Sequence, residues 1–237
     1  MSRFSRGAGA YHAAMHRRLL PVVLSLVLSL ALALPAPARP PHQWHDTFAS
    51  RLEVLALMQS INIELLSSSS ATRTLEAWCG EHHMAAEAKV VARQITGVRK
   101  EPSSEQLERL GVHDAAEVRY RRVELRCGAH VLSVADNWYV PARLTPEMNV
   151  LLESSDTPFG KAVAPLHPYR RTIAVTPLWS PLPHGWELEP RSRFAEHPRR
   201  ALMIPQELFT HRAVLYTEGH VPFSEVVETY QRELVDF

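Results

Sequence analysis

A strand, a turn and a second strand in the middle of this chain constrain its fold more than any other feature. Residues 117–127 alternate between apolar and polar side chains, which predicts a half-buried strand. Gly128-Ala129-His130 would form the turn, and residues 131–140 the partner strand. The apolar positions change from even to odd numbers at Arg121-Arg122, where a β-bulge would accommodate the change. Two strands joined by so short a turn predict an antiparallel sheet.

Helices are predicted before and between the strands. Ser70 is a favourable N-cap residue, and Thr145-Pro146 combines an N-cap with proline at the first helical position. Residues 179–206 contain five prolines and no periodicity, which predicts a long surface loop. The predicted helices cover residues 48–66, 70–78, 105–110 and 145–153, with a helical turn in 157–164, and the further strands cover 88–96, 171–178, 208–216 and 221–230. This order of elements predicts a single α+β domain with an antiparallel sheet.

Charge and histidine spacing argue against nucleic acid and metal ions as partners. The formal net charge is only +1 over 237 residues, so no basic surface is indicated. The 13 histidines are scattered, and no cysteine or histidine spacing typical of zinc occurs in the sequence. The two cysteines, Cys79 and Cys127, are consistent either with one disulfide or with two buried thiols.

The N-terminal 38 residues resemble an export signal. An uncharged run dense in leucine, valine and alanine, Leu19–Ala38, follows two arginines and ends in small residues. We expect residues 1–38 to be a signal peptide and residues 39–237 to form a periplasmic domain. An uncleaved membrane anchor is the first alternative, because the run reaches the minimum of about 17 residues for a bilayer span. A misassigned start, which would leave the protein cytoplasmic, is the second.

Two charged residues occupy unusual positions in the predicted strands. Arg122 faces away from Val123 and Leu125, so the ordinary interpretation is a solvated surface arginine. Without a bulge, however, Arg122 would border apolar surface on its own face. Glu225 would share a face with the apolar residues Phe223 and Val227, so either it lies at a site or the strand register is misjudged.

Five segments, in this order, resemble the chorismate pyruvate-lyase family. They are Ser70–Glu76, Arg122–Cys127, Trp138–Pro141, Thr157–Lys161 and Val221–Glu225. The resemblance covers roughly residues 48–230 and implies an α+β fold whose helices and sheet enclose a buried pocket. It implies a carbon–oxygen lyase that eliminates pyruvate from chorismate to give 4-hydroxybenzoate, as in ubiquinone biosynthesis. Such chemistry requires no metal and no organic cofactor.

The resemblance also implies where a small aromatic carboxylate would bind. Arg122 would hold the carboxylate, because a planar guanidinium meets both oxygens. Glu225 would meet the hydroxyl at the opposite end of the ring, so that Arg122 and Glu225 would be the catalytic pair. Main-chain N–H groups near Ala71, at a helix start, and near Phe159 would complete the pocket.

Two other functions remain open from the sequence. One is a non-catalytic exported protein that binds a small aromatic carboxylate on the same fold, because fold alone does not separate an enzyme from a binder. The same fold serves, by resemblance, as an effector-binding module in some transcription regulators, but we expect no DNA-binding helix pair before the domain here. The other is a protein-interaction role for residues 179–206, with the pocket vestigial. Membrane contact is expected only through the N-terminal segment.

Overall fold

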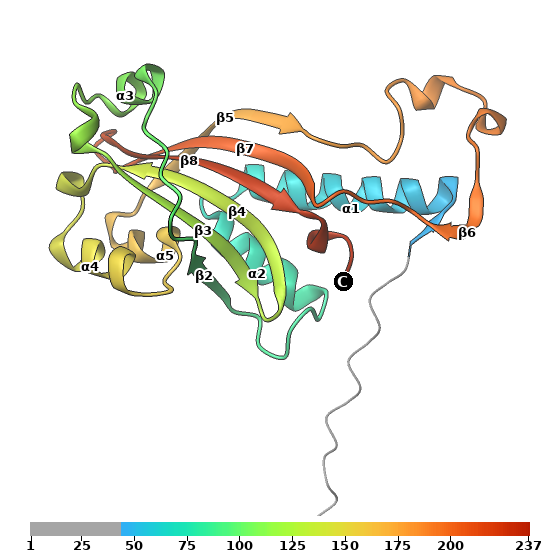
Figure 1. Ribbon diagram of the computed structural model, residues 1–237, viewed down its shortest axis with the longest axis horizontal. Helices are drawn as coiled ribbons and strands as arrows, with labels where there is room; N and C mark the ends of the chain where they lie inside the picture. The colour runs from blue at the N-terminus through green and yellow to red at the C-terminus, as the bar shows by residue number, and fades with distance from the viewer. Residues whose placement is uncertain (1–43) are drawn as a thin grey trace, which may run out of the picture. The chain divides into compact units, whose positions relative to one another are not determined.

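Six antiparallel strands form the central sheet of the computed structural model, which describes residues 44–237 (Figure 1). The strand order is β2-β3-β4-β8-β7-β5, and each neighbouring pair is antiparallel. The strands are β2 (Val90–Gln94), β3 (Arg119–Cys127), β4 (His130–Tyr139), β5 (Tyr169–Pro177), β7 (Glu207–Tyr216) and β8 (Pro222–Gln231). The predicted α+β class and antiparallel sheet are therefore confirmed. The segment 1–38 lies outside the described residues.

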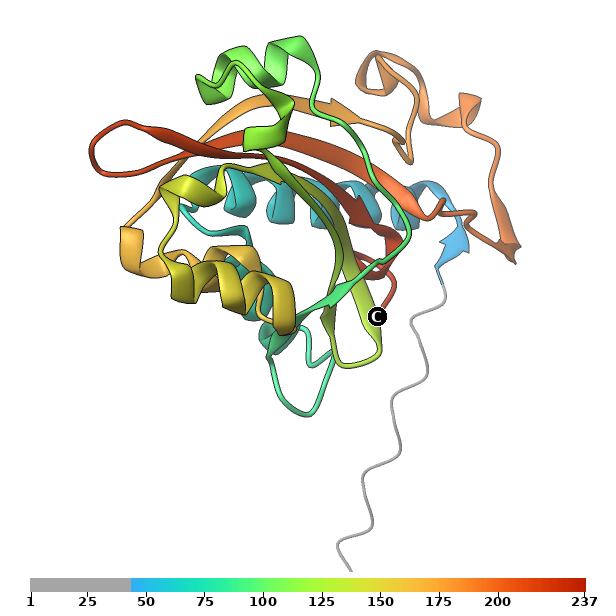
Figure 2. The same cartoon turned by 60° about the vertical axis from the view of Figure 1, so that its left-hand side comes forward.

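The helices lie on both sides of this sheet. In Figure 2 the sheet curves around α1 and α2, while α3 lies on its other side. The helices are α1 (Phe48–Ser67), α2 (Ala71–Glu81), α3 (Ser104–Leu110), α4 (Pro146–Ser154) and α5 (Phe159–Ala162), with short 3-10 turns at Ala115–Glu117, Pro141–Arg143, Ala164–Leu166, Trp186–Leu188, Arg191–Arg193 and Arg232–Leu234. The predicted caps are present: the side chain of Ser70 accepts from the Arg73 N–H, and that of Thr145 from the Met148 N–H. Each cap satisfies one of the free N–H groups of a helix start.

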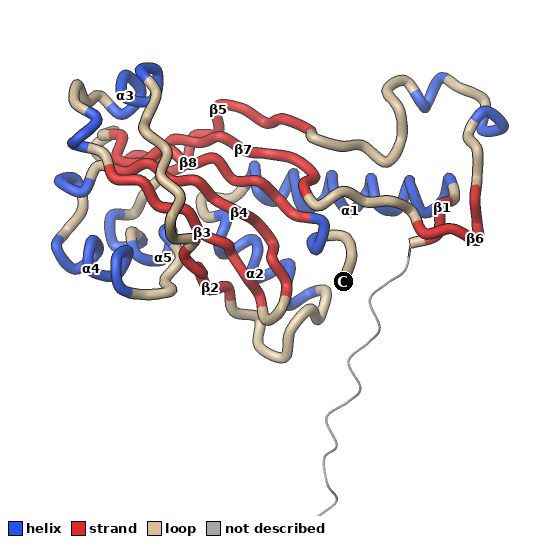
Figure 3. The backbone as a smooth tube through the Cα atoms, in the orientation of Figure 1, coloured by secondary structure: helices blue, strands red, loops and turns tan. Residues whose placement is uncertain are grey.

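The segment predicted as a loop, residues 179–206, forms an arm beside the start of α1 (Figure 3). Most of it is irregular, as predicted, but β6 (His197–Ala201) pairs with β1 (His45–Asp46) in a separate two-stranded sheet. A two-stranded sheet has only edge strands, which tolerate proline. The rings of Trp186 and Phe194 pack on Phe48 of α1, and their centroids lie 5.9 and 5.1 Å, respectively, from that of the Phe48 ring.

Two apolar clusters lie on opposite faces of the six-stranded sheet. The larger one packs the strands against α1 and α2 and includes Leu75, Val123 and many other buried side chains. We call this side the inner face. The smaller one lies under α3, on the outer face, and includes Leu110, Val118 and Trp138. The sheet is therefore covered on both faces at one end.

The second cluster explains the change of phase in the sequence. The odd-numbered residues of β3 from 121 to 127 are all buried, and the even-numbered residues between them are only partly buried. The register with β4 is regular at Arg121-Arg122, and its irregularity lies between Leu125 and Arg126. The predicted bulge at Arg121-Arg122 is therefore wrong. Val118 precedes the strand and is apolar because it packs in the outer cluster.

A disulfide joins the two cysteines that the sequence left open. Cys79 lies in α2 and Cys127 at the end of β3, and both residues are fully buried. The bond closes a loop of 48 residues between the helix and the strand. It therefore fixes the distance between two elements that both contribute residues to one cavity.

Candidate functional site

A small cavity lies between the inner face of the sheet and the starts of α2 and α5. The space open to the centre of a water-sized sphere is about 60 Å³, which is enough for several waters or for a small organic molecule. The apolar part of its wall comes mainly from the strands, and the polar part from the helix starts and three charged residues. The lining residues are Ser69, Ser70, Ala71, Thr72, Arg121, Val123, Leu125, Ala135, Asn137, Phe159, Gly160, Arg170, Leu215, Val226 and Glu228.

Arg121 is the least compensated charge in this wall. It is only 3% exposed, and its Nη2 donates to the carbonyl oxygens of Thr157 at 3.2 Å and Ser155 at 3.5 Å. Its Nε has no hydrogen-bond partner, and within residues 44–237 no carboxylate forms an ion pair with it. Burial lowers the pKa of the guanidinium, an effect that the nearby Tyr139 and Asp156 oppose. A buried cation without a counter-ion is costly, so this geometry favours an anion beside Arg121.

The start of α2 adds a second positive feature to the same cavity. Ala71 and Thr72, the first two residues of this eleven-residue helix, both line the cavity. The partial positive charge of a helix dipole is concentrated in this first turn, where N–H groups also lack helical partners. A helix start next to a buried guanidinium is suited to bind a carboxylate or a similar anion.

A buried ion pair forms another part of the wall. Arg170 and Glu228 have side chains only 6% and 7% exposed, with 2.7 Å between Nη2 and Oε2. The hydroxyl of Tyr230 donates to the same Glu228 oxygen at 2.9 Å. Burial is the largest single effect and by itself would lower the pKa of Arg170, but Glu228 and Tyr230 together outweigh it and the pKa is raised. Because these two charges cancel, the three charged side chains of the wall leave a net charge of +1.

Next to this pair, His211 should make stability depend on pH. It is fully buried, its Nε2 lies 2.7 Å from Asn62 Oδ1, and burial lowers its pKa from 6.5 to about 4. Between these two pH values the unfolded chain binds a proton that the folded chain does not. The free energy of unfolding should therefore fall by about 3 kcal/mol as pH drops from 6.5 to 4.

Urea unfolding of the wild type and of His211→Gln at pH 7, 5.5 and 4 tests this expectation. The variant should lose the part of the pH dependence that comes from His211, so that the two stability profiles converge toward acid pH. Parallel profiles over the whole range would contradict a neutral, buried imidazole.

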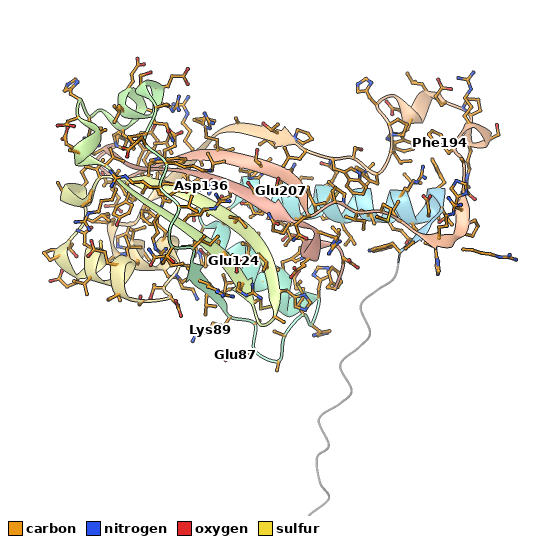
Figure 4. All side chains as sticks on the ribbon, in the orientation of Figure 1. Glu87, Lys89, Glu124, Asp136, Phe194 and Glu207 are labelled. Atoms are coloured by element: carbon orange, nitrogen blue, oxygen red, sulfur yellow. A yellow bond between two sulfur atoms is a disulfide. The ribbon has the colours of Figure 1, made fainter. Side chains whose placement is uncertain are left out.

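The structure brings together only two of the four residues to which the sequence assigned a site. Ala71 and Phe159 line the cavity. Arg122 lies on the outer face, with its Nε 3.7 Å from Oδ1 of Asp136, which Figure 4 labels. Glu225 is also on the outer face, where Arg109 of α3 donates to it from Nε at 2.7 Å and from Nη2 at 3.1 Å. Arg122 and Glu225 are thus separated from the cavity by the sheet itself.

The sequence interpretation missed three charged residues of the cavity. Arg121 shares the odd-numbered phase of Val123 and Leu125, so strict alternation along β3 would have placed it on the buried face. Glu228 has the even phase of Val226 and Tyr230, and this pattern was also available. Arg170 had no comparable signal. It is buried because its side chain reaches from β5 to Glu228 on β8.

Comparison with known proteins gives one close relative and several distant structures. No family model matches the chain. It is 43% identical over 199 residues to the protein named "Uncharacterized protein y4mC" of Sinorhizobium fredii, covering 82% of each chain. PhnF of Mycobacterium smegmatis is 13% identical, with a TM-score of 0.45, covering 72% of this chain and 67% of that one. A GntR-family transcriptional regulator of Enterococcus faecalis is also 13% identical, with a TM-score of 0.36 and coverage of 62% and 96%.

These findings correct the function that the resemblance implied. The pair expected to grip the two ends of a substrate, Arg122 and Glu225, lies on the face of the sheet opposite the cavity. The similar structures are described as transcriptional regulators or effector domains, and those descriptions name no chorismate pyruvate-lyase. Assignment to the lyase family, the lyase activity and the role in ubiquinone biosynthesis are therefore wrong.

The expected periplasmic location is also contradicted. The similar structures are described as transcriptional regulators and not as exported proteins. The segment 1–38, on which that expectation rested, lies outside the described residues. Within residues 44–237, no helix is long and apolar enough to cross a membrane.

Proposed function

Because this chain belongs to the same family as y4mC of Sinorhizobium fredii, whose name states no activity, we propose a function from the chain's own cavity. The protein binds a small aromatic carboxylate between Arg121 and the start of α2. The observation that carries this proposal is the burial of Arg121 without an ion-pair partner within residues 44–237, where its Nε also has no hydrogen-bond partner. A bound carboxylate would supply both the missing charge and the missing acceptor.

The charges of the wall favour a ligand with a single negative charge. Arg170 and Glu228 neutralise each other, which leaves the charge of Arg121 alone to be compensated. A carboxylate matches this charge and can accept from Nε and from a helix-start N–H at the same time. A dianion would leave an excess negative charge beside a largely apolar wall, which is unfavourable.

The apolar walls favour a flat ring behind the carboxylate. Val123, Leu125 and Val226 form the sheet side of the cavity, and Phe159 lies at the start of α5. The Phe159 ring is held in place by Tyr139 and Phe223, whose centroids lie 5.6 and 6.2 Å away. A ring bound between these strands and Phe159 would gain from burial and from aromatic contact.

The same wall favours binding over catalysis. Glu228 is the one carboxylate among the described lining residues, and both Arg170 and Tyr230 hold it. No histidine or cysteine is among the described residues that line the cavity. Proton transfer needs a group that can give up its partners and reach the ligand, and a carboxylate held in this way is poorly suited to it.

Replacing Arg121 with methionine should weaken binding of benzoate, the simplest probe of this class, roughly 10- to 150-fold. This range corresponds to the loss of hydrogen bonds to a charged group, worth about 1.5–3 kcal/mol. Methionine preserves the length and much of the volume of the side chain without the charge. Calorimetric titration of the full-length wild type and variant measures the change.

Arg122→Met is the matched control, because it removes the neighbouring arginine from the opposite face of the same strand. Its affinity for benzoate should stay within about twofold of the wild type, since a surface ion pair contributes little. Equal losses in the two variants, or no loss in Arg121→Met, would show that the cavity arginine does not bind the ligand.

A further inference from the structure

The segment that joins α4 to α5 is a short extended strap that ends at the cavity wall, and we define it as residues 155–159. It begins at Ser155, whose N–H still bonds to Leu151 in α4, and ends at Phe159, the first residue of α5. The Thr157 N–H donates to Ser155 Oγ at 3.2 Å, which braces the strap internally. Its last residue, Phe159, lines the cavity.

Hydrogen bonds from two other elements, β3 and β2, hold this strap. Toward the cavity, Arg121 Nη2 donates to the carbonyl of Thr157 and, at longer distance, to that of Ser155. Toward the sheet edge, the carbonyl of Asp156 accepts from the N–H of Ala92 at 2.8 Å. Alternating carbonyl directions are typical of extended chain. The strap is therefore fastened between the cavity arginine and β2, the edge strand of the sheet.

The hydrogen bonds from Arg121 to the strap come from a guanidinium that has no ion-pair partner within residues 44–237. Carbonyl oxygens accept from the guanidinium but do not neutralise it, so the buried cation favours hydration. Because Arg121 is only 3% exposed, more water can reach it only if one of the segments packed against it moves. An anion at Nε would neutralise the guanidinium where it lies and leave Nη2 bonded to the strap.

We propose that the strap is a gate for the cavity, and that an anion bound to Arg121 holds it closed. This inference rests on the proposed anion site. The two equilibria are coupled through one side chain, since Nε would donate to the ligand while Nη2 holds the strap. By linkage, a ligand that binds only the closed state shifts the strap toward that state. The Asp156 carbonyl accepts from the Ala92 N–H at the edge of the sheet. Ligand binding in the cavity would therefore also stabilise this hydrogen bond to β2.

Hydrogen exchange at the Ala92 amide tests the gate in the full-length protein, because this N–H bonds to the strap and not to a neighbouring strand. Saturating benzoate should slow its exchange at least tenfold in the wild type. Arg121→Met should speed its exchange at least tenfold without ligand and should abolish the response to benzoate. The Ala135 amide, in the middle strand β4, reports whole-domain opening and should change much less.

Arg122→Met again serves as the control and should exchange like the wild type at Ala92. If Arg121→Met loses its circular dichroism signal, Arg121→Lys replaces it, since lysine keeps the charge without the planar fork. Exchange at Ala92 within twofold of the wild type in a folded Arg121 variant would overturn the proposal.

The gate and the anion site can fail separately. If benzoate binds by calorimetry but leaves Ala92 exchange unchanged, the coupling is wrong and the binding function stands. If benzoate gives no heat and no slowing, while Arg121→Met still speeds exchange at Ala92, the hold on the strap is supported and the choice of ligand is wrong.

Discussion

Replacing Glu228 with glutamine is expected to lower the free energy of unfolding by about 3–5 kcal/mol, the usual cost of breaking a buried ion pair. Glutamine has nearly the same shape and can still accept from Tyr230, so little else changes. What remains is the Arg170 guanidinium, whose side chain is 6% exposed and would have no opposing charge. Urea unfolding at pH 7 measures the difference.

The double variant Arg170→Met/Glu228→Gln is the matched control. It removes both charges, so most of the stability lost in Glu228→Gln should return, because a buried pair replaced by uncharged groups is often near neutral. A loss below about 1 kcal/mol in the single variant would mean that water or a local rearrangement already solvates Arg170.

Reduction of the Cys79–Cys127 disulfide should lower the free energy of unfolding by about 4 kcal/mol. The bond closes a 48-residue loop, and the loss of loop-closure entropy in the unfolded chain gives this magnitude. Because the bond ties α2 to β3, benzoate affinity should also fall when the protein is reduced. Urea unfolding with and without a strong reductant measures the first effect, and calorimetric titration the second.

The Cys79→Ala/Cys127→Ala double variant controls for the reductant itself. Its stability should be the same with and without reductant, and its affinity for benzoate should match that of the reduced wild type. Reduction that changes wild-type stability by less than about 1 kcal/mol would show that the bond constrains the unfolded chain little.

Much of the fold could be predicted from local patterns. The central hairpin is readable because a half-buried strand alternates with period two, and the Ser70 and Thr145 caps because helix starts need acceptors. Ala71 directly follows the Ser70 cap, whereas the resemblance, and no local pattern, indicated the position of Phe159 in the cavity wall. Features set by neighbours in sequence were therefore accessible without a structure.

The face of each strand could not be assigned reliably from the same patterns. Val118 and Val123 are apolar for different reasons, because they pack in separate clusters on opposite sides of the sheet. Reading them as one pattern implied a bulge, and the resemblance then selected Arg122 in place of Arg121. In β8, the register with β7 shifts near Phe223, so this residue packs in the inner cluster although Glu225 lies on the outer face.

Non-local contacts account for the rest of what was missed. Arg170 is buried only because its side chain crosses from the edge strand β5 to reach Glu228, two strands away. The partners of Glu225 were equally hidden, since Arg109 is 116 positions distant in the sequence. Whether a charged side chain lies at a site or in a structural ion pair depends on such partners, which no local pattern contains.

Calorimetric titration of the full-length protein with benzoate and, in parallel, with benzamide is the decisive test of the anion site at Arg121. The two molecules have nearly the same size and shape, but only benzoate carries a negative charge that can pair with Arg121. We expect saturable heat with benzoate and binding at least tenfold weaker with benzamide, because a charge-assisted contact is lost. Equal binding of both, or no binding of benzoate, would contradict an anion site at Arg121.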